Sequence, residues 1–384
     1  MDDWRNGGFG LYIHWPFCAS KCPYCDFNSH VATRIDQKRW QAAYLAEIDR
    51  VAALTEGRVL NSVFFGGGTP SLMEPEVVAA ILDRVRRAWR PANDLEVTLE
   101  ANPGSVEAGR FRAYAEGGVN RLSMGIQALN DRDLQKLGRM HSVADARRAF
   151  DIARAAFARV SFDLIYARQD QTAESWAAEL REALAMAVDH FSLYQLTIED
   201  GTVFGARAAA GKLPGLPIDD VASDMYLITQ DICAEAGLPA YEVSNHARPG
   251  SESRHNLIYW RYGDYAGIGP GAHGRLTLAG RRMATEAPKA PGDWLDRVEK
   301  AGSGDGSAER LDGPDQATEF LMMGLRLAEG GDMARFEALA GQPLNPAALA
   351  HLQEIGMVSR DGSRLIATRA GRPVLNAILR ELLA

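Results

Sequence analysis

Three of the four cysteines in this chain, Cys18, Cys22 and Cys25, fall within the eight residues CASKCPYC. Thiolates are ligands for soft metals, and three on one loop can hold three irons of a cubane cluster while the fourth iron stays open to another ligand. Structural zinc is the alternative, because His14 and His30 flank the cysteines, but no second Cys or His pair with zinc spacing follows nearby. The spacing therefore favours an iron–sulfur cluster.

The fourth cysteine and the composition indicate a reduced, water-soluble protein. Cys233 lies in a helical apolar pattern, where a lone cysteine is expected to pack. Four cysteines in 384 residues, after a start without the apolar core of a signal peptide, argue against a disulfide framework and for the cytoplasm. No apolar run is long enough to span a membrane. The net charge of −8 argues against broad binding to nucleic acid.

Six short β-branched or aromatic runs alternate with amphipathic stretches, which predicts six βα units and a parallel sheet. Six units are too few for a closed eight-stranded barrel, so an open doubly wound sheet and a partial barrel both remain. The predicted strands are residues 10–15, 62–67, 95–101, 121–127, 159–167 and 190–198, and the predicted helices are residues 37–54, 75–89, 106–116, 143–157 and 172–187.

Polar or glycine-rich segments follow these predicted strands. The second strand ends in FFGGGTPS, whose glycines allow close approach of backbone N–H groups to a ligand. Glu100, Gln127 and Asp163 belong to the third, fourth and fifth strands, and the sixth carries Gln195 and Thr197. Ligands in such folds bind at the carboxyl ends of the strands, so this ring of groups predicts a binding site.

The cysteine stretch, C-x3-C-x2-C with an aromatic residue before the last cysteine, resembles the signature of radical S-adenosylmethionine (SAM) proteins. Together with YIHWPFC, GGGTPS, LEANP, GIQ and HNLIYW, it resembles the coproporphyrinogen oxidase-like branch, and within it the HemW-type haem chaperones, over about residues 9–384. The resemblance implies a three-quarter barrel of six βα units. It also implies a 4Fe-4S cluster on Cys18, Cys22 and Cys25, with SAM on the open iron.

The same resemblance gives the strand-end residues roles around SAM. Gly67, Gly68 and Thr69 match the segment that binds the methionyl amino group, and Glu100 matches a carboxylate that accepts from polar groups of the cofactor. The remaining matches to the cofactor pocket are Tyr12, Tyr24, Gln127, Arg139 and Asp163. One departure is the segment ARQDQT after Asp163, where the family commonly has a Gly-Leu-Pro-Gly type turn.

A second group of residues lies in HNLIYWRYGDYAGIGPGAHGR, where glycines and aromatic residues suit a flat apolar ligand. An aromatic patch that closes the barrel is the alternative. HNLIYW resembles the H-N-x-x-Y-W element of the haem chaperones, which makes His255 the preferred haem ligand, with His246 and His273 as further candidates.

The pattern changes near residue 313, where three helices, a hairpin turning at Asp361-Gly362 and a last helix predict a small α+β, winged-helix-like domain. Seven Arg, no Lys and eight Asp or Glu in residues 313–384 argue against a DNA-binding face. Met322 and Met323 are predicted core residues. The expected parts are residues 1–240, a connecting segment 241–312 with a linker at 302–309, and residues 313–384.

The resemblance leaves two main functions, a haem chaperone that transfers haem to acceptor haemoproteins and an oxygen-independent coproporphyrinogen III oxidase. A radical methyltransferase is a third. The oxidases carry a fourth cysteine two places after the third, where this chain has Phe27, and an N-terminal extension, whereas Cys18 lies near the start. Both features favour the chaperone. A low-potential electron donor is an expected partner, nucleic acid is not, and a homodimer is left open.

Overall fold

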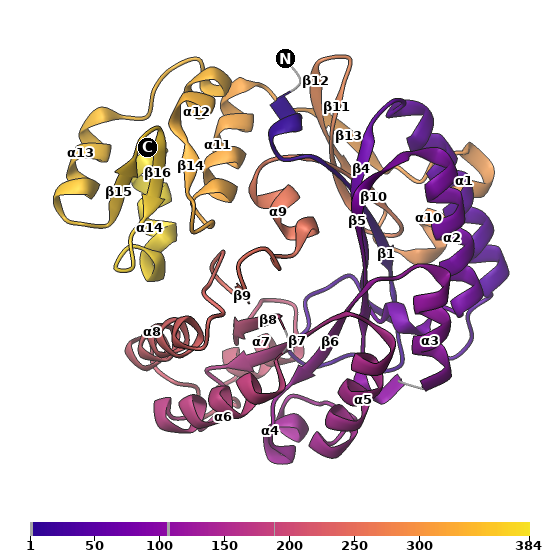
Figure 1. Ribbon diagram of the computed structural model, residues 1–384, viewed down its shortest axis with the longest axis horizontal. Coiled ribbons are helices and arrows are strands. Elements are labelled where there is room, and N and C mark those ends of the chain that lie inside the picture. The colour runs from indigo at the N-terminus through magenta and orange to yellow at the C-terminus, as the bar shows by residue number, and fades with distance from the viewer. Residues whose placement is uncertain (1–2, 106–107, 188) are drawn as a thin grey trace.

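The computed structural model describes residues 3–105, 108–187 and 189–384 (Figure 1). Its main sheet has eleven strands in the order β13-β12-β11-β10-β1-β4-β5-β6-β7-β8-β9. The strands are β1 Phe9–Trp15, β4 Val59–Gly67, β5 Arg90–Ala101, β6 Arg121–Gln127, β7 Arg159–Tyr166, β8 His190–Gln195, β9 Asn245–Ala247, β10 Asp264–Ile268, β11 His273–Leu278, β12 Arg281–Glu286 and β13 Ser307–Arg310.

The strands from β1 through β4, β5, β6 and β7 to β8 are parallel, and β1 also pairs in parallel with β10 on its other side. The remaining pairs in this sheet, β8 with β9 and β10 through β13, are antiparallel. Over the described residues β9 and β13 are the two edges of the sheet. The predicted partial barrel of six βα units is confirmed, and β10 to β13 extend its sheet on the side of β1, the first strand.

The helices of the units cover the convex side of the sheet (Figure 1). The residues at several helix N-termini are typical of helix starts. Pro75 is the first residue of α2, and Ser142 and Thr172 form capping boxes at the N-termini of α5 and α6. The predicted start of the third helix, residues 106–107, lies outside the described residues. The helices of this part are α1 Gln37–Leu54, α2 Pro75–Ala88, α3 Ala108–Gly117, α4 Asp131–Lys136, α5 Val143–Ala156, α6 Ala173–Met186, α7 Val203–Ala209, α8 Asp219–Glu235, α9 Arg254–Trp260 and α10 Pro291–Ala301.

The main hydrophobic core lies between the sheet and these helices. Near β1 it is aromatic, because Trp15 of β1 packs on Trp40 of α1, whose ring stacks on Trp294 of α10 at 5.6 Å. The interior side of the strands is polar rather than aromatic, because buried polar groups lie there. Arg121 donates to Ser161 at 3.0 Å and contacts His190 Nδ1 at 3.2 Å, which satisfies a guanidinium that burial would otherwise destabilise.

The C-terminal part has the predicted order of elements. Its core includes Phe320, Leu321, Leu365 and Ile378, and Tyr262 of the preceding segment packs into it. Met323 packs against this core, but the prediction for Met322 is wrong, because its side chain is exposed. The elements are α11 Gly313–Gly324, β14 Gly331–Asp332, α12 Met333–Ala340, α13 Pro346–Glu354, β15 Val358–Asp361, β16 Arg364–Ala367 and α14 Leu375–Leu382.

The predicted linker at 302–309 is wrong in its last three residues, which belong to β13 and pair with β12. The divisions at residues 240 and 312 stay predictions. Among the described helices, none combines the length and the apolar character that crossing a membrane requires.

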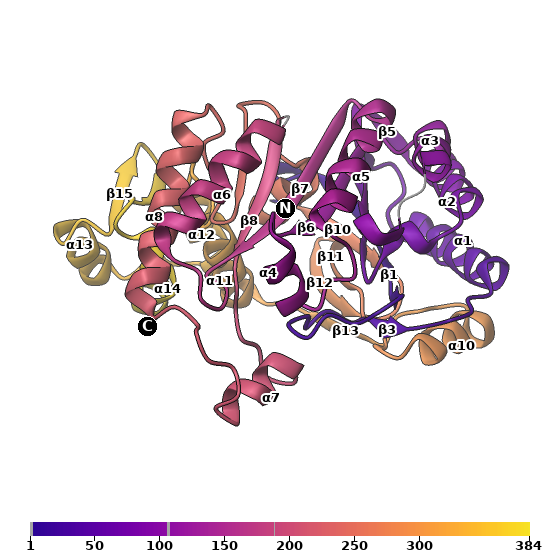
Figure 2. The ribbon, with the colours of Figure 1, turned by 90° about the horizontal axis from the view of Figure 1, so that it is seen from below.

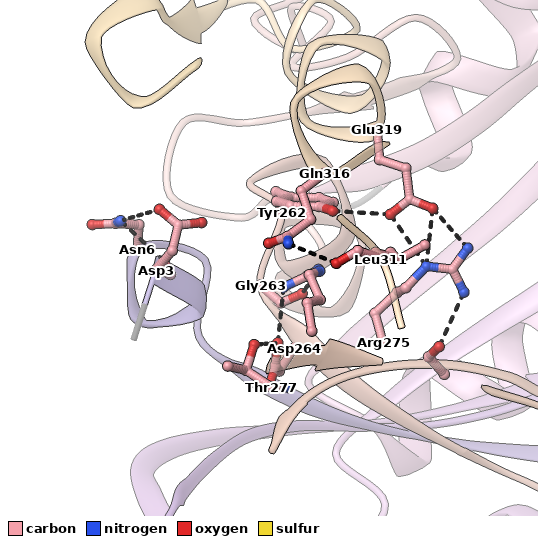
Figure 3. A network of polar contacts seen from close by, with 12 residues as sticks. Asp3, Asn6, Tyr262, Gly263, Asp264, Arg275, Thr277, Leu311, Gln316 and Glu319 are labelled. Carbon is pink, nitrogen blue, oxygen red and sulfur yellow. Dashed lines mark hydrogen bonds and ion pairs between the residues drawn. The ribbon is translucent and has the colours of Figure 1, made fainter. Parts of the chain in front are cut away.

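A buried carboxylate, Asp264 at the start of β10, ties this extended edge together (Figure 3). It forms ion pairs with Arg58 at 2.6 Å and with Arg282 of β12 at 2.9 Å. It also accepts from the backbone N–H of Thr277 at 2.5 Å and from its hydroxyl at 3.0 Å. Because these partners come from three segments, Asp264 fixes β11 and β12 against the barrel.

Replacing Asp264 by Ala should lower the free energy of unfolding by about 3–5 kcal/mol, because the buried guanidinium of Arg282 would lose its counter-charge. Denaturant unfolding measures this change, with Glu309→Ala on the exposed strand β13 as the control. A loss no larger than that of the control would contradict this role of Asp264.

Candidate functional site

The three clustered cysteines follow β1: Cys18 is the last residue of β2 Phe17–Cys18, and Cys22 and Cys25 lie between β2 and β3 His30–Val31. We call residues 18–30 the cluster loop. All three thiols are free and line one cavity of about 400 Å³, the first chamber. The N–H of Cys25 donates to the carbonyl of Cys22 at 3.1 Å, which turns the loop between these two residues. The first strand of the barrel therefore delivers three thiols to one chamber.

Neighbouring elements hold the cluster loop from several sides. The N–H of Phe204 in α7 donates to the carbonyl of Pro23 at 2.9 Å. The side chain of Asn28 donates to the carbonyls of Pro270 and Lys289, both at 2.9 Å, and so joins the loop to both ends of the β11–β12 hairpin. Figure 2 shows α4, α7 and β3 together in the lower half of the view, the side on which this loop lies.

Polar groups contact two of the sulfur atoms, and in general a hydrogen bond from a donor favours the thiolate form of a cysteine. Thr69 Oγ1 donates to Cys18 Sγ at 3.5 Å, and Arg139 Nη1 donates to Cys22 Sγ at 3.2 Å. Burial acts in the opposite direction and raises the pKa of the Cys18 and Cys25 thiols. Iron binds thiolates, so metal binding must displace these protons.

Over the described residues, no three His, Cys, Asp or Glu side chains converge as ligands of one metal ion would. A cubane cluster makes a different demand, because each thiolate binds its own iron. Three thiols that line one chamber, two of them contacted by hydrogen-bond donors, fit that demand.

Eight of the ten residues predicted for the cofactors line the first chamber. They are Tyr24, Gly67, Gly68, Thr69, Glu100, Gln127, Arg139 and Asp163. Tyr12 lies on the neighbouring second chamber instead, and His255 lines neither. The carboxyl ends of the strands thus bring the ring of polar groups together, as the alternation of strands and helices in the sequence predicted. Their roles toward SAM stay predictions.

Contacts within the chain require glycine at Gly67, the last residue of β4, and at Gly68 after it. Gly67 has a φ of 111°, and a Cβ there would lie 2.6 Å from the ring of His14. A Cβ on Gly68 would lie 2.6 Å from the carbonyl oxygen of Phe17. These contacts press the turn against β1 and the cluster loop, which explains the glycines without a ligand.

Two structural features of Gln127 are typical of a functional position. Its φ of 75° is uncommon for a residue with a side chain, and it follows an irregularity in the pairing of β6 with β7. Its buried Oε1 has no hydrogen-bond partner among the described residues. A strained residue with an unsatisfied acceptor beside a chamber is typical of a functional position.

Arg139 is held in place rather than exposed on a helix surface. Besides its bond to Cys22, its Nη2 donates to the carbonyl of Gly125 at 2.9 Å. The loop after β7, where the sequence departs from the related pattern, is also well anchored. Arg168 there pairs with Asp133 at 2.8 Å and with Glu179 at 2.5 Å.

Two carboxyl groups, Glu100 and Asp163, lie close to each other on the chamber wall. Burial raises the pKa of Glu100 to about 8, and repulsion from Asp163 acts in the same direction. Burial also raises the pKa of Asp163 to about 6, partly offset by a hydrogen bond from Ser192. At neutral pH without a ligand, Glu100 is therefore largely protonated and can donate a hydrogen bond.

A second chamber of about 740 Å³ adjoins the first. Both are lined by Lys21, Asp26, Phe27, Ser29, Gly67 and Glu100. Aromatic side chains of α9 and of the segment after it form much of the second chamber, namely Tyr259, Trp260, Tyr262 and Tyr265. Glu319 of α11 joins the C-terminal part to this wall, because it accepts from Tyr262 at 3.0 Å and from Arg275 at 2.8 Å (Figure 3).

The HNLIYW segment forms α9, which lies inside the curve of the sheet (Figure 1). His255 is buried there, with Nδ1 2.8 Å from Ser62 Oγ and Nε2 2.8 Å from Tyr259 OH. Its ring also stacks on Phe64 at 5.0 Å. Both nitrogens thus lie within hydrogen-bond distance of a hydroxyl group, and a bond from His255 to haem iron stays a prediction. The segment reaches the second chamber through Tyr259 and Trp260.

Comparison with known proteins agrees with this arrangement. The radical SAM superfamily profile matches residues 12–183, and the HemN C-terminal domain profile matches residues 311–374. A solved structure, coproporphyrinogen III oxidase (HemN) from Escherichia coli, a radical SAM enzyme, superposes with a TM-score of 0.80 over 98% of this chain and 90% of its own. At 23% identity it supports the fold alone.

Curated relatives are closer in sequence. Heme chaperone HemW of Escherichia coli is 40% identical over 86% of each chain, and that of Bacillus subtilis is 33% identical over 97% of this chain and 99% of its own. The mitochondrial radical S-adenosyl methionine domain-containing protein 1 of Mus musculus is 43% identical over 83% of this chain and 73% of its own. The chain therefore belongs to the HemW family of the radical SAM superfamily.

Replacing Cys18, Cys22 or Cys25 by Ala should abolish assembly of an iron–sulfur cluster, because each removes one of three iron ligands. Iron and sulfide per chain after anaerobic reconstitution measure the effect. Cys233→Ala is the control, since that thiol is buried in the main core. A cluster lost equally in the Cys233 variant would contradict the assignment.

Replacing Glu100 by Gln should stabilise the cluster-free chain relative to the wild type, and this gain should increase as the pH rises. The folded carboxyl stays neutral up to a pKa of about 8, whereas 4.5 is its ordinary value, so the wild type loses stability across that interval. The amide cannot ionise and escapes this loss. The difference in Tm between variant and wild type should grow from pH 4.5 to pH 8. A difference independent of pH would show that Glu100 is not held neutral.

Proposed function

We propose that this protein is a haem chaperone, which binds haem and transfers it to acceptor haemoproteins. The observation that carries the proposal is similarity along most of the chain to proteins named heme chaperone HemW, at 33–40% identity. The second chamber supports it, because its volume lies in the range of about 300–1,000 Å³ common for small-molecule sites.

The three cysteines of the cluster loop would hold a 4Fe-4S cluster in the first chamber. When bound, that cluster supplies an open iron for SAM and an electron for cleavage of its sulfonium bond. Gly67, Gly68 and Thr69 would offer polar groups to the methionyl end of SAM. Tyr12, Tyr24, Gln127, Arg139 and Asp163 complete the proposed cofactor surroundings.

The chain's own residues prepare this chamber in distinct ways. Arg139 stabilises negative charge on Cys22 through a charge-assisted hydrogen bond. Glu100 holds a proton in this chamber and can release it when a cation such as SAM binds, because nearby positive charge lowers a carboxyl pKa. SAM binding near Glu100 should therefore release protons at neutral pH.

An oxygen-independent coproporphyrinogen III oxidase is the second candidate function, favoured by the shared fold. Phe27 argues against it, because this residue stands where the oxidases carry a further cysteine. Its ring is 60% exposed and lines both chambers, so it contributes apolar surface rather than a metal ligand at their shared wall. We therefore favour the chaperone.

The proposal implies several partners. Reduction of the cluster needs a low-potential electron donor, and delivery needs apo-haemoproteins as acceptors. Iron binding needs reduced thiols, so we place the protein in a reducing compartment such as the cytoplasm.

The test compares haem transfer with porphyrin chemistry. The reconstituted chain should bind haem stoichiometrically and pass it to an apo-haemoprotein, followed by the change in Soret absorption. With coproporphyrinogen III, SAM and a low-potential reductant, it should release no carbon dioxide and no protoporphyrinogen. Catalytic turnover would overturn the chaperone assignment in favour of the oxidase.

A further inference from the structure

The second chamber contains the groups that a haem molecule would need, and the following inference rests on the proposed haem-binding function. Flat conjugated rings bind well between aromatic side chains, which the chamber offers in Tyr259, Trp260 and Tyr265. Haem also needs an axial ligand for its iron and cations for its two propionates.

Three imidazoles line the second chamber, and two of them are already engaged. The ring of His14 contacts Tyr12 OH at 3.1 Å through Nδ1 and the carbonyl of Asn28 at 2.9 Å through Nε2. Nε2 of His30 lies 3.1 Å from Asn28 Oδ1. The third, His273, makes no hydrogen bond within the described residues, and its side chain is 56% exposed.

A carboxylate lies near the ring of His273. His273 begins β11 directly opposite Glu286 of β12, whose Oε1 lies 3.8 Å from its Nε2. Histidines that bind metals commonly direct the second nitrogen at a carboxylate, which orients the ring and raises its basicity. At 3.8 Å Glu286 is near the ring but not hydrogen-bonded to it, so a ring nitrogen is available to iron.

The loop before His273 is built to keep it near the cluster loop. Gly271 has a φ of 72°, and a Cβ there would lie 2.4 Å from the side-chain nitrogen of Asn28. The same nitrogen donates to the carbonyl of Pro270. Because Asn28 is part of the cluster loop, the position of His273 is tied to that of the three cysteines.

The cationic side chains of the second chamber differ in whether a carboxylate neutralises them. Arg275 and Arg282 are neutralised by Glu319 and Asp264. Lys21 and Lys289 line the same chamber at exposed positions, and the described residues provide no carboxylate within ion-pair distance of either. Two unneutralised lysines at the mouth of an aromatic chamber suit the two carboxylates of a porphyrin.

We propose that haem binds in the second chamber, with His273 as an axial ligand of its iron and Lys21 and Lys289 as partners of its propionates. His255 then has a structural role, because its contacts with Ser62 and Tyr259 hold Tyr259 in the wall of the chamber. The haem would lie beside the cluster, since the two chambers share part of their walls.

The first test uses the full chain, reconstituted anaerobically and titrated with haem. His273→Ala should shift the Soret band, remove the iron–histidine signal from the resonance Raman spectrum of the ferrous form, and weaken binding by roughly tenfold or more. His351→Ala is a matched control, because that side chain is equally exposed, lies 4.0 Å from Glu381 and lines neither chamber. The control should bind haem like the wild type.

The second test addresses the propionates. Lys289→Gln should weaken binding of haem by roughly tenfold. It should leave binding of haem dimethyl ester, which lacks the carboxylates, unchanged. Lys38→Gln, an exposed lysine on α1, should affect neither ligand.

The outcomes separate this inference from the function on which it rests. A wild type that binds no haem would overturn both. Stoichiometric haem binding with an unchanged His273→Ala spectrum would overturn the ligand assignment alone, and loss of the histidine signal in His255→Gln with retention in His273→Ala would move the ligand to His255. A retained histidine signal in His273→Ala, lost in no other variant of the chamber, would place the haem elsewhere.

Discussion

The parallel pairing of β1 with both β4 and β10 is the constraint on which the rest of the structure depends. It places β1 inside the sheet, so the loop at its end has neighbours on two sides. Toward β4 lies the first chamber, lined by the ends of the barrel strands. Toward β10 lies the second chamber, closed by β11, α9 and α11. The cluster loop therefore serves both chambers, and a ligand in either one lies close to the cysteines.

Polar groups are concentrated inside the barrel. Parallel strands covered on both faces are normally apolar, but here buried Ser62, Arg121 and Ser161 face partners on neighbouring elements. His255 completes one such set of contacts. The interior below the chambers is thus held by hydrogen bonds, whereas aromatic packing of Trp15, Trp40 and Trp294 stabilises the outside of β1.

Much of this could be predicted from the sequence, because strand and helix periods, helix caps and the cysteine spacing are local signals. The ring around the first chamber followed from the rule that ligands bind at strand ends. What could not be predicted depends on contacts between distant segments. The contact of His255 Nδ1 with Ser62 is one example, because the HNLIYW motif carries no signal of a partner so far away in the chain. Likewise Ser307 belongs to β13 because β12 offers an edge, although its surroundings have the composition of a linker.

The central claim is that a porphyrin binds in a chamber that shares a wall with the cluster site. The most direct measurement is the fluorescence lifetime of zinc protoporphyrin bound stoichiometrically to the full chain, with and without the assembled cluster. Energy and electron transfer to an iron–sulfur cluster fall steeply with distance, so the lifetime should be much shorter when the cluster is present. An unchanged lifetime, with the porphyrin bound in both forms, would contradict the account.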